Sequence, residues 1–197
     1  MKNKQIQNLV LTALMAALVV VLGFTPLGLI PLGFINVTTL CIPVIIGTVV
    51  LGLKPGLVLG AAFGLVSLYK AFIAPSALVA PILQSSVPLL IIMSMLPRLL
   101  LPVAAHLVYR LFSGMQKGRR FAAIPAAIVG SLTNTVFYLG LMVVFYALLG
   151  IDNPTILTTV ASIAGIAGTS EAVVAAIITS PLVIALQQFY NKGATKK

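Results

Sequence analysis

Charged side chains are scarce in this sequence, and acidic ones are almost absent. The 197 residues include only two Asp or Glu, and charged residues make up 7% of the chain. Apolar residues make up 60%, which is more than a soluble domain of this length can bury. The composition therefore predicts an integral membrane protein. It leaves no room for a water-soluble catalytic or nucleic-acid-binding domain.

Side chains for metal or nucleophilic chemistry are equally few. The single cysteine, Cys41, excludes an internal disulfide and, with one histidine in the chain, gives no metal site. No nucleophile–base pair can be assembled from these residues, so we expect no enzyme. The chain also lacks a Gly-x-x-x-x-Gly-Lys-Ser/Thr phosphate loop, so we expect no cofactor in it and assign any use of ATP to partner subunits.

Apolar segments of spanning or nearly spanning length follow one another along the whole chain. A span needs about 20 apolar residues. The pattern predicts an all-α membrane protein with six transmembrane helices in a single domain, residues 1–197. The expected segments are 7–24, 38–53, 56–73, 81–112, 121–149 and 158–189.

Basic residues fall mainly in the connections on one side of this predicted bundle. Six spans place both termini on the same side, and cytoplasmic connections are the ones enriched in Lys and Arg. With the termini inside, Lys70 is the outer basic residue, and Asp152 also lies outside. The distribution predicts cytoplasmic termini. The inner set is Lys2, Lys4, Lys54, Arg110, Lys117, Arg119, Arg120, Lys192, Lys196 and Lys197.

Arg98 is the one arginine expected deep within a span. A charge at membrane depth is costly and by default marks a functional site with a partner. Arg98 lies twelve residues before Arg110, or about 18 Å from the inner surface, and Asn134 lies thirteen residues after Phe121, or about 20 Å. The arginine fork matches a carboxylate, and asparagine both donates and accepts. The two predict a site for an anion that also carries hydroxyl or amide groups. For Asn134 alone, an interhelical hydrogen bond is the alternative.

Three further polar residues are candidates for contact with a ligand. Glu171 is the only acid expected within the membrane, and its role stays open between binding ligand, balancing the charge of Arg98 and facing water at the outer end. Gln84 and Asn36 are candidate contacts near that end. The connection over residues 24–38 is rich in Pro and Gly yet apolar, so we expect it to fold back over the helices as a lid.

Small residues mark one face of the first predicted helix. Ala13 and Ala17 are spaced i, i+4, which lets another helix pack closely against them.

Several short strings in the sequence resemble the substrate-binding S components of energy-coupling factor (ECF) vitamin transporters, and most of all the pantothenate-specific ones. The likeness covers nearly the whole chain. The strings are Phe24–Gly33, Ile35–Gly47, Leu51–Gly56, Phe63–Ser67, Gly130–Thr135 and Thr169–Ala172.

This resemblance implies a six-helix subunit of the cell membrane that captures a vitamin, here pantothenate, from outside. It would then dock onto a transmembrane T protein driven by two ATPases. It implies that Ala13 and Ala17 form the docking contact and that Arg98 and Asn134 hold the ligand. One departure is Cys41, where the family pattern has histidine. The alternatives are an S component for riboflavin, a pyridoxine-type vitamin or cobalamin, or a stand-alone secondary transporter, which would need more buried acids than Glu171.

Overall fold

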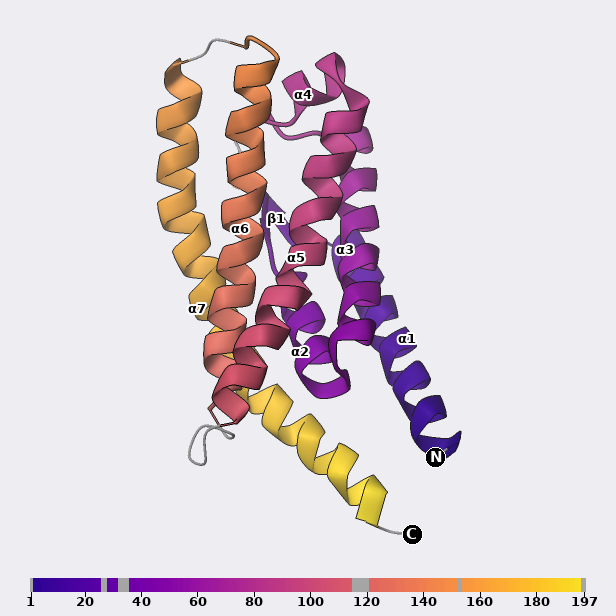
Figure 1. The fold of residues 1–197 in the computed structure, drawn as a ribbon. Helices are drawn as coiled ribbons and strands as arrows, with labels where there is room; N and C mark the ends of the chain where they lie inside the picture. Colours follow the sequence, from indigo (N-terminus) through magenta and orange to yellow (C-terminus); the bar gives the residue numbers. More distant parts are fainter. Residues whose placement is uncertain (1, 26–27, 32–35, 115–120, 152–153, 196–197) are drawn as a thin grey trace.

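The computed structural model is a bundle of long helices that run roughly along one axis (Figure 1). It describes residues 2–25, 28–31, 36–114, 121–151 and 154–195. Seven helices and two three-residue strands make up these parts of the chain. Their bounds are α1 Lys2–Phe24, β1 Leu29–Pro31, β2 Asn36–Thr38, α2 Cys41–Leu51, α3 Leu53–Ile73, α4 Ala80–Ser85, α5 Val87–Ser113, α6 Ala123–Leu148 and α7 Pro154–Thr195.

Five of the helices are long and apolar enough to cross a membrane. They are α1, α3, α5, α6 and the part of α7 over Gly168–Leu186. Large apolar side chains on their outer faces are exposed, for example Leu9 at 71% and Leu111 at 71%. A soluble protein would bury such side chains, whereas a lipid environment accepts them. The protein is therefore a multi-helix membrane protein.

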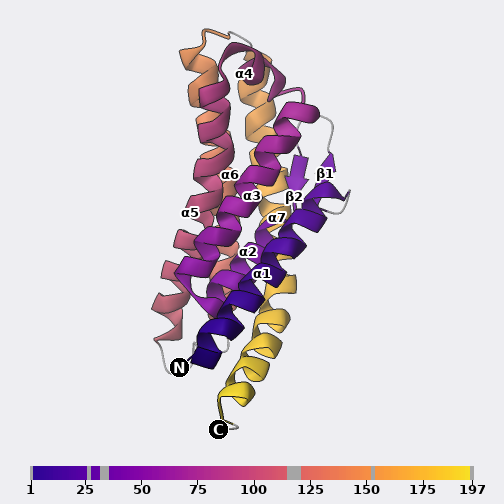
Figure 2. The same ribbon diagram turned by 90° about the vertical axis from the view of Figure 1, so that its right-hand side faces the viewer.

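The predicted second span differs from the others. Its helix, α2, has 11 residues and is about 16 Å long, roughly half of the hydrocarbon thickness of a bilayer. The chain before it forms β2, which pairs antiparallel with β1 so that Pro31 lies opposite Asn36 and Leu29 opposite Thr38. The strand pair lies alongside the helices at mid-height of the bundle (Figure 2). Within the expected span, residues 38–53, Thr38 ends β2, α2 covers Cys41–Leu51, and Leu53 already begins α3.

Both termini lie at one end of the bundle, together with the turn between α2 and α3 (Figure 1). Exposed basic residues at that end include Lys54 and Arg110. At the opposite end, Lys70 lies 5.9 Å from the centre of the Phe24 ring, where α1 and α3 finish. We call the first end the basic end.

Two apolar cores fill the bundle, one above the other. The core nearer the basic end includes Leu101 of α5, Ala127 of α6 and Ala175 of α7. The other includes Met93 of α5, Leu139 of α6 and Val160 of α7. Buried polar residues fall between the two cores on each of these helices: Arg98 on α5, Asn134 and Thr135 on α6, and Glu171 on α7. Buried Thr179 of α7, by contrast, lies within the core nearer the basic end. The fold therefore holds a buried polar layer between two apolar cores.

Close contact between α3 and α5 depends on glycines spaced by four residues. Gly56, Gly60 and Gly64 lie on the face of α3 that meets α5. A methyl group added at Gly60 would collide with the backbone carbonyl oxygen of Arg98, and one at Gly64 with Met95. Small residues at this spacing let two membrane helices approach closely. The glycine-lined face of α3 therefore sets how closely Arg98 approaches α3 and at which level along that helix it lies.

Candidate functional site in the buried polar layer

Arg98 is held in place by a defect in its own helix. Pro97 has no N–H, so the carbonyl of Met93, four residues earlier, lacks its helical donor. The Nη1 of Arg98 donates to that carbonyl at 3.1 Å. In a membrane such a freed carbonyl must find another donor within the protein. The proline and the arginine that follows it therefore form one local unit.

Side chains from α3 and α6 complete the surroundings of the guanidinium. Its Nη2 donates to Ser67 Oγ at 3.0 Å. Its carbon Cζ lies 5.2 Å from the centre of the Phe63 ring and 4.4 Å from that of Tyr138, within the range of cation–π attraction. Phe63 and Ser67 are one turn apart on α3. The guanidinium is thus flanked by two aromatic rings and tied at both Nη atoms.

Among the described residues of this layer, three polar atoms are buried without a hydrogen-bond partner. The Nε of Arg98, a donor, and the Oδ1 of Asn134, an acceptor, form one pair, and the Oγ of Ser131 is the third atom. Asn134 lies one turn before Tyr138 on α6, so it faces the same part of the bundle as the ring next to Arg98. An unsatisfied buried polar group is costly, and in native proteins it calls for an explanation such as a bound ligand. A ligand with an acceptor for Nε and a donor for Oδ1 matches this pair.

Glu171 has partners other than Arg98. Its Oε1 accepts from the backbone N–H of Thr38 at 2.7 Å, and its Oε2 accepts from Thr135 Oγ1 at 2.9 Å. The opposite charges of Arg98 and Glu171 are near enough to attract each other, but no ion pair joins these two described residues. Direct pairing, one of the roles left open by the sequence, is therefore not what holds either side chain.

Gln84, Ala13 and Ala17 lie apart from this layer. Gln84 is exposed on α4, and none of the hydrogen bonds among the described residues of the layer involves it. The backbone of Asn36 lies in β2, and its side chain is outside the described part of the structure. Ala13 and Ala17 are exposed on α1. Cys41 is buried at the start of α2, where its thiol donates to the Thr38 carbonyl at 3.6 Å.

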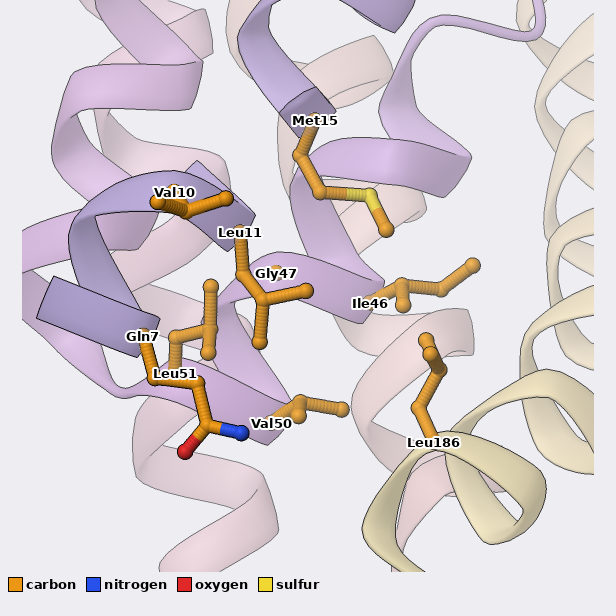
Figure 3. A pocket seen from close by; sticks show the side chains of 9 residues that line it. All are labelled: Gln7, Val10, Leu11, Met15, Ile46, Gly47, Val50, Leu51 and Leu186. Atoms are coloured by element: carbon orange, nitrogen blue, oxygen red, sulfur yellow. The ribbon is translucent and has the colours of Figure 1, made fainter. Parts of the chain in front are cut away.

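An apolar groove of about 220 Å³ lies near the basic end, between α1, α2 and α7 (Figure 3). Among the described residues of its lining, Gln7 alone has a polar side chain, and none of them is a cation. A lining of this kind suits aliphatic groups. Its lining is Gln7, Val10, Leu11, Met15, Ile46, Gly47, Val50, Leu51 and Leu186.

Comparison with known proteins agrees with this architecture. The family model described as "ECF transporter, substrate-specific component" matches residues 7–183. The chain belongs to this family. Among curated proteins, it is similar to the "Pantothenic acid transporter PanT" of Lactococcus lactis subsp. cremoris (strain MG1363), with 28% identity over 98% of this chain and 99% of that protein. The family match confirms the resemblance found in the sequence, and this S component is a membrane-embedded substrate-binding subunit of a transporter.

Several residues around Arg98 and Glu171 in this S component were not identified from the sequence. Phe63, Ser67, Tyr138 and Thr135 are ordinary residues in membrane helices and gave no signal by themselves. Part of the arrangement was present in the sequence, however. Tyr138 is four residues after Asn134, and Pro97 frees a carbonyl within reach of the next side chain. Nothing in the sequence indicated the contact between Thr38 and Glu171, which are 133 residues apart.

Proposed function

We propose that this S component binds pantothenate in the buried polar layer. Pantothenate carries a carboxylate, an amide and two hydroxyl groups. Its carboxylate would bind Arg98 from the Nε side, which no protein acceptor occupies among the described residues. Its hydroxyl or amide group would donate to Asn134 Oδ1. The observation that carries this proposal is a buried arginine without an ion-pair partner among the described residues, together with a buried acceptor on α6 that has no donor there. The name of the Lactococcus relative supports the choice of vitamin.

The charge of Arg98 provides the main test. Arg98→Ala should nearly eliminate pantothenate binding to the purified protein in calorimetry, because a buried carboxylate would lose its partner. Arg98→Lys should recover only part of the affinity, since lysine lacks the planar fork. Lys54→Ala, which removes an exposed cation at the basic end, is the matched control and should bind normally.

An analogue of pantothenate in which an alcohol replaces the carboxylate distinguishes loss of the charge pair from general damage to the fold. It should bind the native protein poorly and lose much less affinity than the acid does on Arg98→Ala. Equal binding of acid and alcohol by the native protein would refute the anionic site. Mass spectrometry of small molecules released from the purified protein would identify the natural ligand directly.

Asn134 is expected to contribute one buried hydrogen bond to the ligand. Asn134→Ala should weaken pantothenate binding by about 1–3 kcal/mol, measured by the same calorimetry. If the affinity is unchanged while the thermal stability falls, Asn134 joins helices and does not contact the ligand.

We also propose that the protein lies in the cell membrane with both termini in the cytoplasm and with its site open to the outside when undocked. The basic end, which holds both termini and exposed Lys54 and Arg110, supports this orientation. The strand pair and α2 together would complete the second of six crossings. Irregular backbone is tolerated at membrane depth where protein buries it, and Thr38 and α2 up to Val49 are buried.

Delivery of the ligand would require partners, since transport through the family's T protein uses two ATPases. The exposed face of α1 supports its role as the docking helix. In α1, 11% of the span is buried within the subunit, against 28–39% in the other four candidate spans. Ala13 and Ala17 are exposed on it and would allow a partner helix to approach closely.

A further inference from the structure

The carboxylate of Glu171 joins three separate elements of the fold. It projects from α7, and its two oxygens accept hydrogen bonds from β2 and from α6. The residue is 8% exposed, so both bonds are shielded from water. A hydrogen bond from a backbone N–H to a carboxylate is roughly twice as strong as one between neutral groups. The contact is therefore a strong tie between the chain at Thr38 and the two helices beside it.

Thr38 is the point where the second crossing changes from strand to helix. All of its hydrogen-bonding groups are engaged. Its N–H donates to Glu171, its Oγ1 accepts from the N–H of Leu40 at 3.1 Å, and its carbonyl accepts from Cys41 Sγ. At this depth no solvent is available to replace a lost partner. Loss of the Glu171 carboxylate would leave the Thr38 amide unsatisfied and release the strand from α7.

The same carboxylate reaches the wall of the proposed ligand site. Its second partner, Thr135, is the neighbour of Asn134 on α6. We propose that Glu171 is a positioning residue of the binding site: through the Thr38 amide and the Thr135 hydroxyl it fixes the junction of β2 and α2 against α6 and α7. It thereby determines how long a bound ligand is retained, without contacting the ligand. The part concerning ligand retention rests on the proposed function.

Hydrogen–deuterium exchange tests the tie without any ligand. In the purified protein, Glu171→Ala should speed exchange in the peptide that contains Thr38 by roughly tenfold or more, the factor that one charge-assisted hydrogen bond represents. Glu171→Gln should keep exchange close to the native rate, because its amide can accept from the Thr38 N–H and donate to Thr135. Unchanged exchange in Glu171→Ala would overturn the proposal, as would equal acceleration in both variants.

Binding kinetics test the effect on the site. With pantothenate as probe, Glu171→Ala should raise the dissociation rate constant about tenfold or more, and Glu171→Gln should restore it to within a few fold. Thr135→Val removes the second partner and should also speed dissociation. Thr133→Val is the matched control, since the hydrogen bond that Thr133 Oγ1 donates to the Val129 carbonyl, at 2.7 Å, lies within α6. Thr133→Val should leave the rate unchanged.

The outcomes distinguish this proposal from the proposed function. If the native protein does not bind pantothenate, the proposed function fails, while the exchange experiment still decides whether Glu171 ties down Thr38. A second outcome is that the native protein binds pantothenate, that Glu171→Gln loses as much affinity as Glu171→Ala, and that hydrogen exchange in Glu171→Gln stays normal. Glu171 would then act on the ligand through its charge, and the positioning role would be wrong. Equal dissociation rates in Thr135→Val and Thr133→Val would also contradict it.

Discussion

Gly60→Ala would test whether the contact between α3 and α5 sets the position of Arg98. The added methyl group would collide with the Arg98 carbonyl and come within 3.3 Å of Pro102 Cγ. Neither neighbour can turn away, since one is backbone and the other belongs to a ring, so the helices must separate. Overpacking of this kind costs about 1–3 kcal/mol. Pro102 also deprives the Arg98 carbonyl of its helical donor, so moving α5 disturbs a backbone group that is already without its usual partner.

Gly140→Ala is the matched control for this substitution. Gly140 lies within α6, and nothing stands within 4 Å of an added methyl group there. Alanine should therefore be neutral or stabilise the helix by up to about 1 kcal/mol. Thermal unfolding in detergent should show a fall of a few degrees for Gly60→Ala and none for Gly140→Ala. Pantothenate affinity should fall only for Gly60→Ala. Equal stability and affinity of the two variants would refute the close-contact argument.

Two other predictions concern the anchoring of Arg98 and the docking surface. Ser67→Ala should weaken pantothenate binding by about 0.5–1.5 kcal/mol in calorimetry, because Arg98 Nη2 loses its acceptor; unchanged affinity would show that Ser67 does not hold the fork. Ala13→Trp or Ala17→Trp should abolish ATP-driven uptake into cells while leaving pantothenate binding to the isolated subunit intact. Val136→Trp, at a site on α6 that is 64% exposed, is the control. Normal uptake by both alanine variants would remove α1 from the docking surface.

Long apolar segments and the position of Arg98 could be predicted from the sequence because both depend on local composition. The lengths of the apolar segments predicted α1, α3, α5 and α6. The predicted fourth segment, however, is divided at Ser86 into the short helix α4 and the long helix α5. These lengths could not show that the helix of the second segment has only 11 residues and follows a strand that ends at Thr38, since residues 38–53 are as apolar as a longer helix would be. There the backbone is fixed by distant partners such as Glu171, which no local pattern reveals.

For the same reason, only part of the candidate site could be predicted from the sequence. A lone arginine within an apolar segment is conspicuous in any sequence, and its spacing from Arg110 predicted its depth. The partners of this arginine are not conspicuous, because Ser67 and Phe63 come from another helix, α3. How α3 and α5 are rotated relative to each other depends on their packing at Gly60, which the sequence of either helix alone does not reveal. Balancing the charge of Arg98 was one of three roles that the sequence left open for Glu171, yet the hydrogen-bond partners of both side chains among the described residues are neutral groups.

The tie between Thr38 and Glu171 also bears on how the chain is built into the membrane. Helices such as α1 and α3 satisfy their own backbone and can enter the bilayer one at a time as they are synthesised. The strand before α2 cannot, because its Thr38 amide depends on a carboxylate that is made 133 residues later. The second crossing must therefore wait, incomplete or shielded, until α7 has arrived. Assembly of this subunit is then complete only when α7 supplies Glu171 to the second crossing.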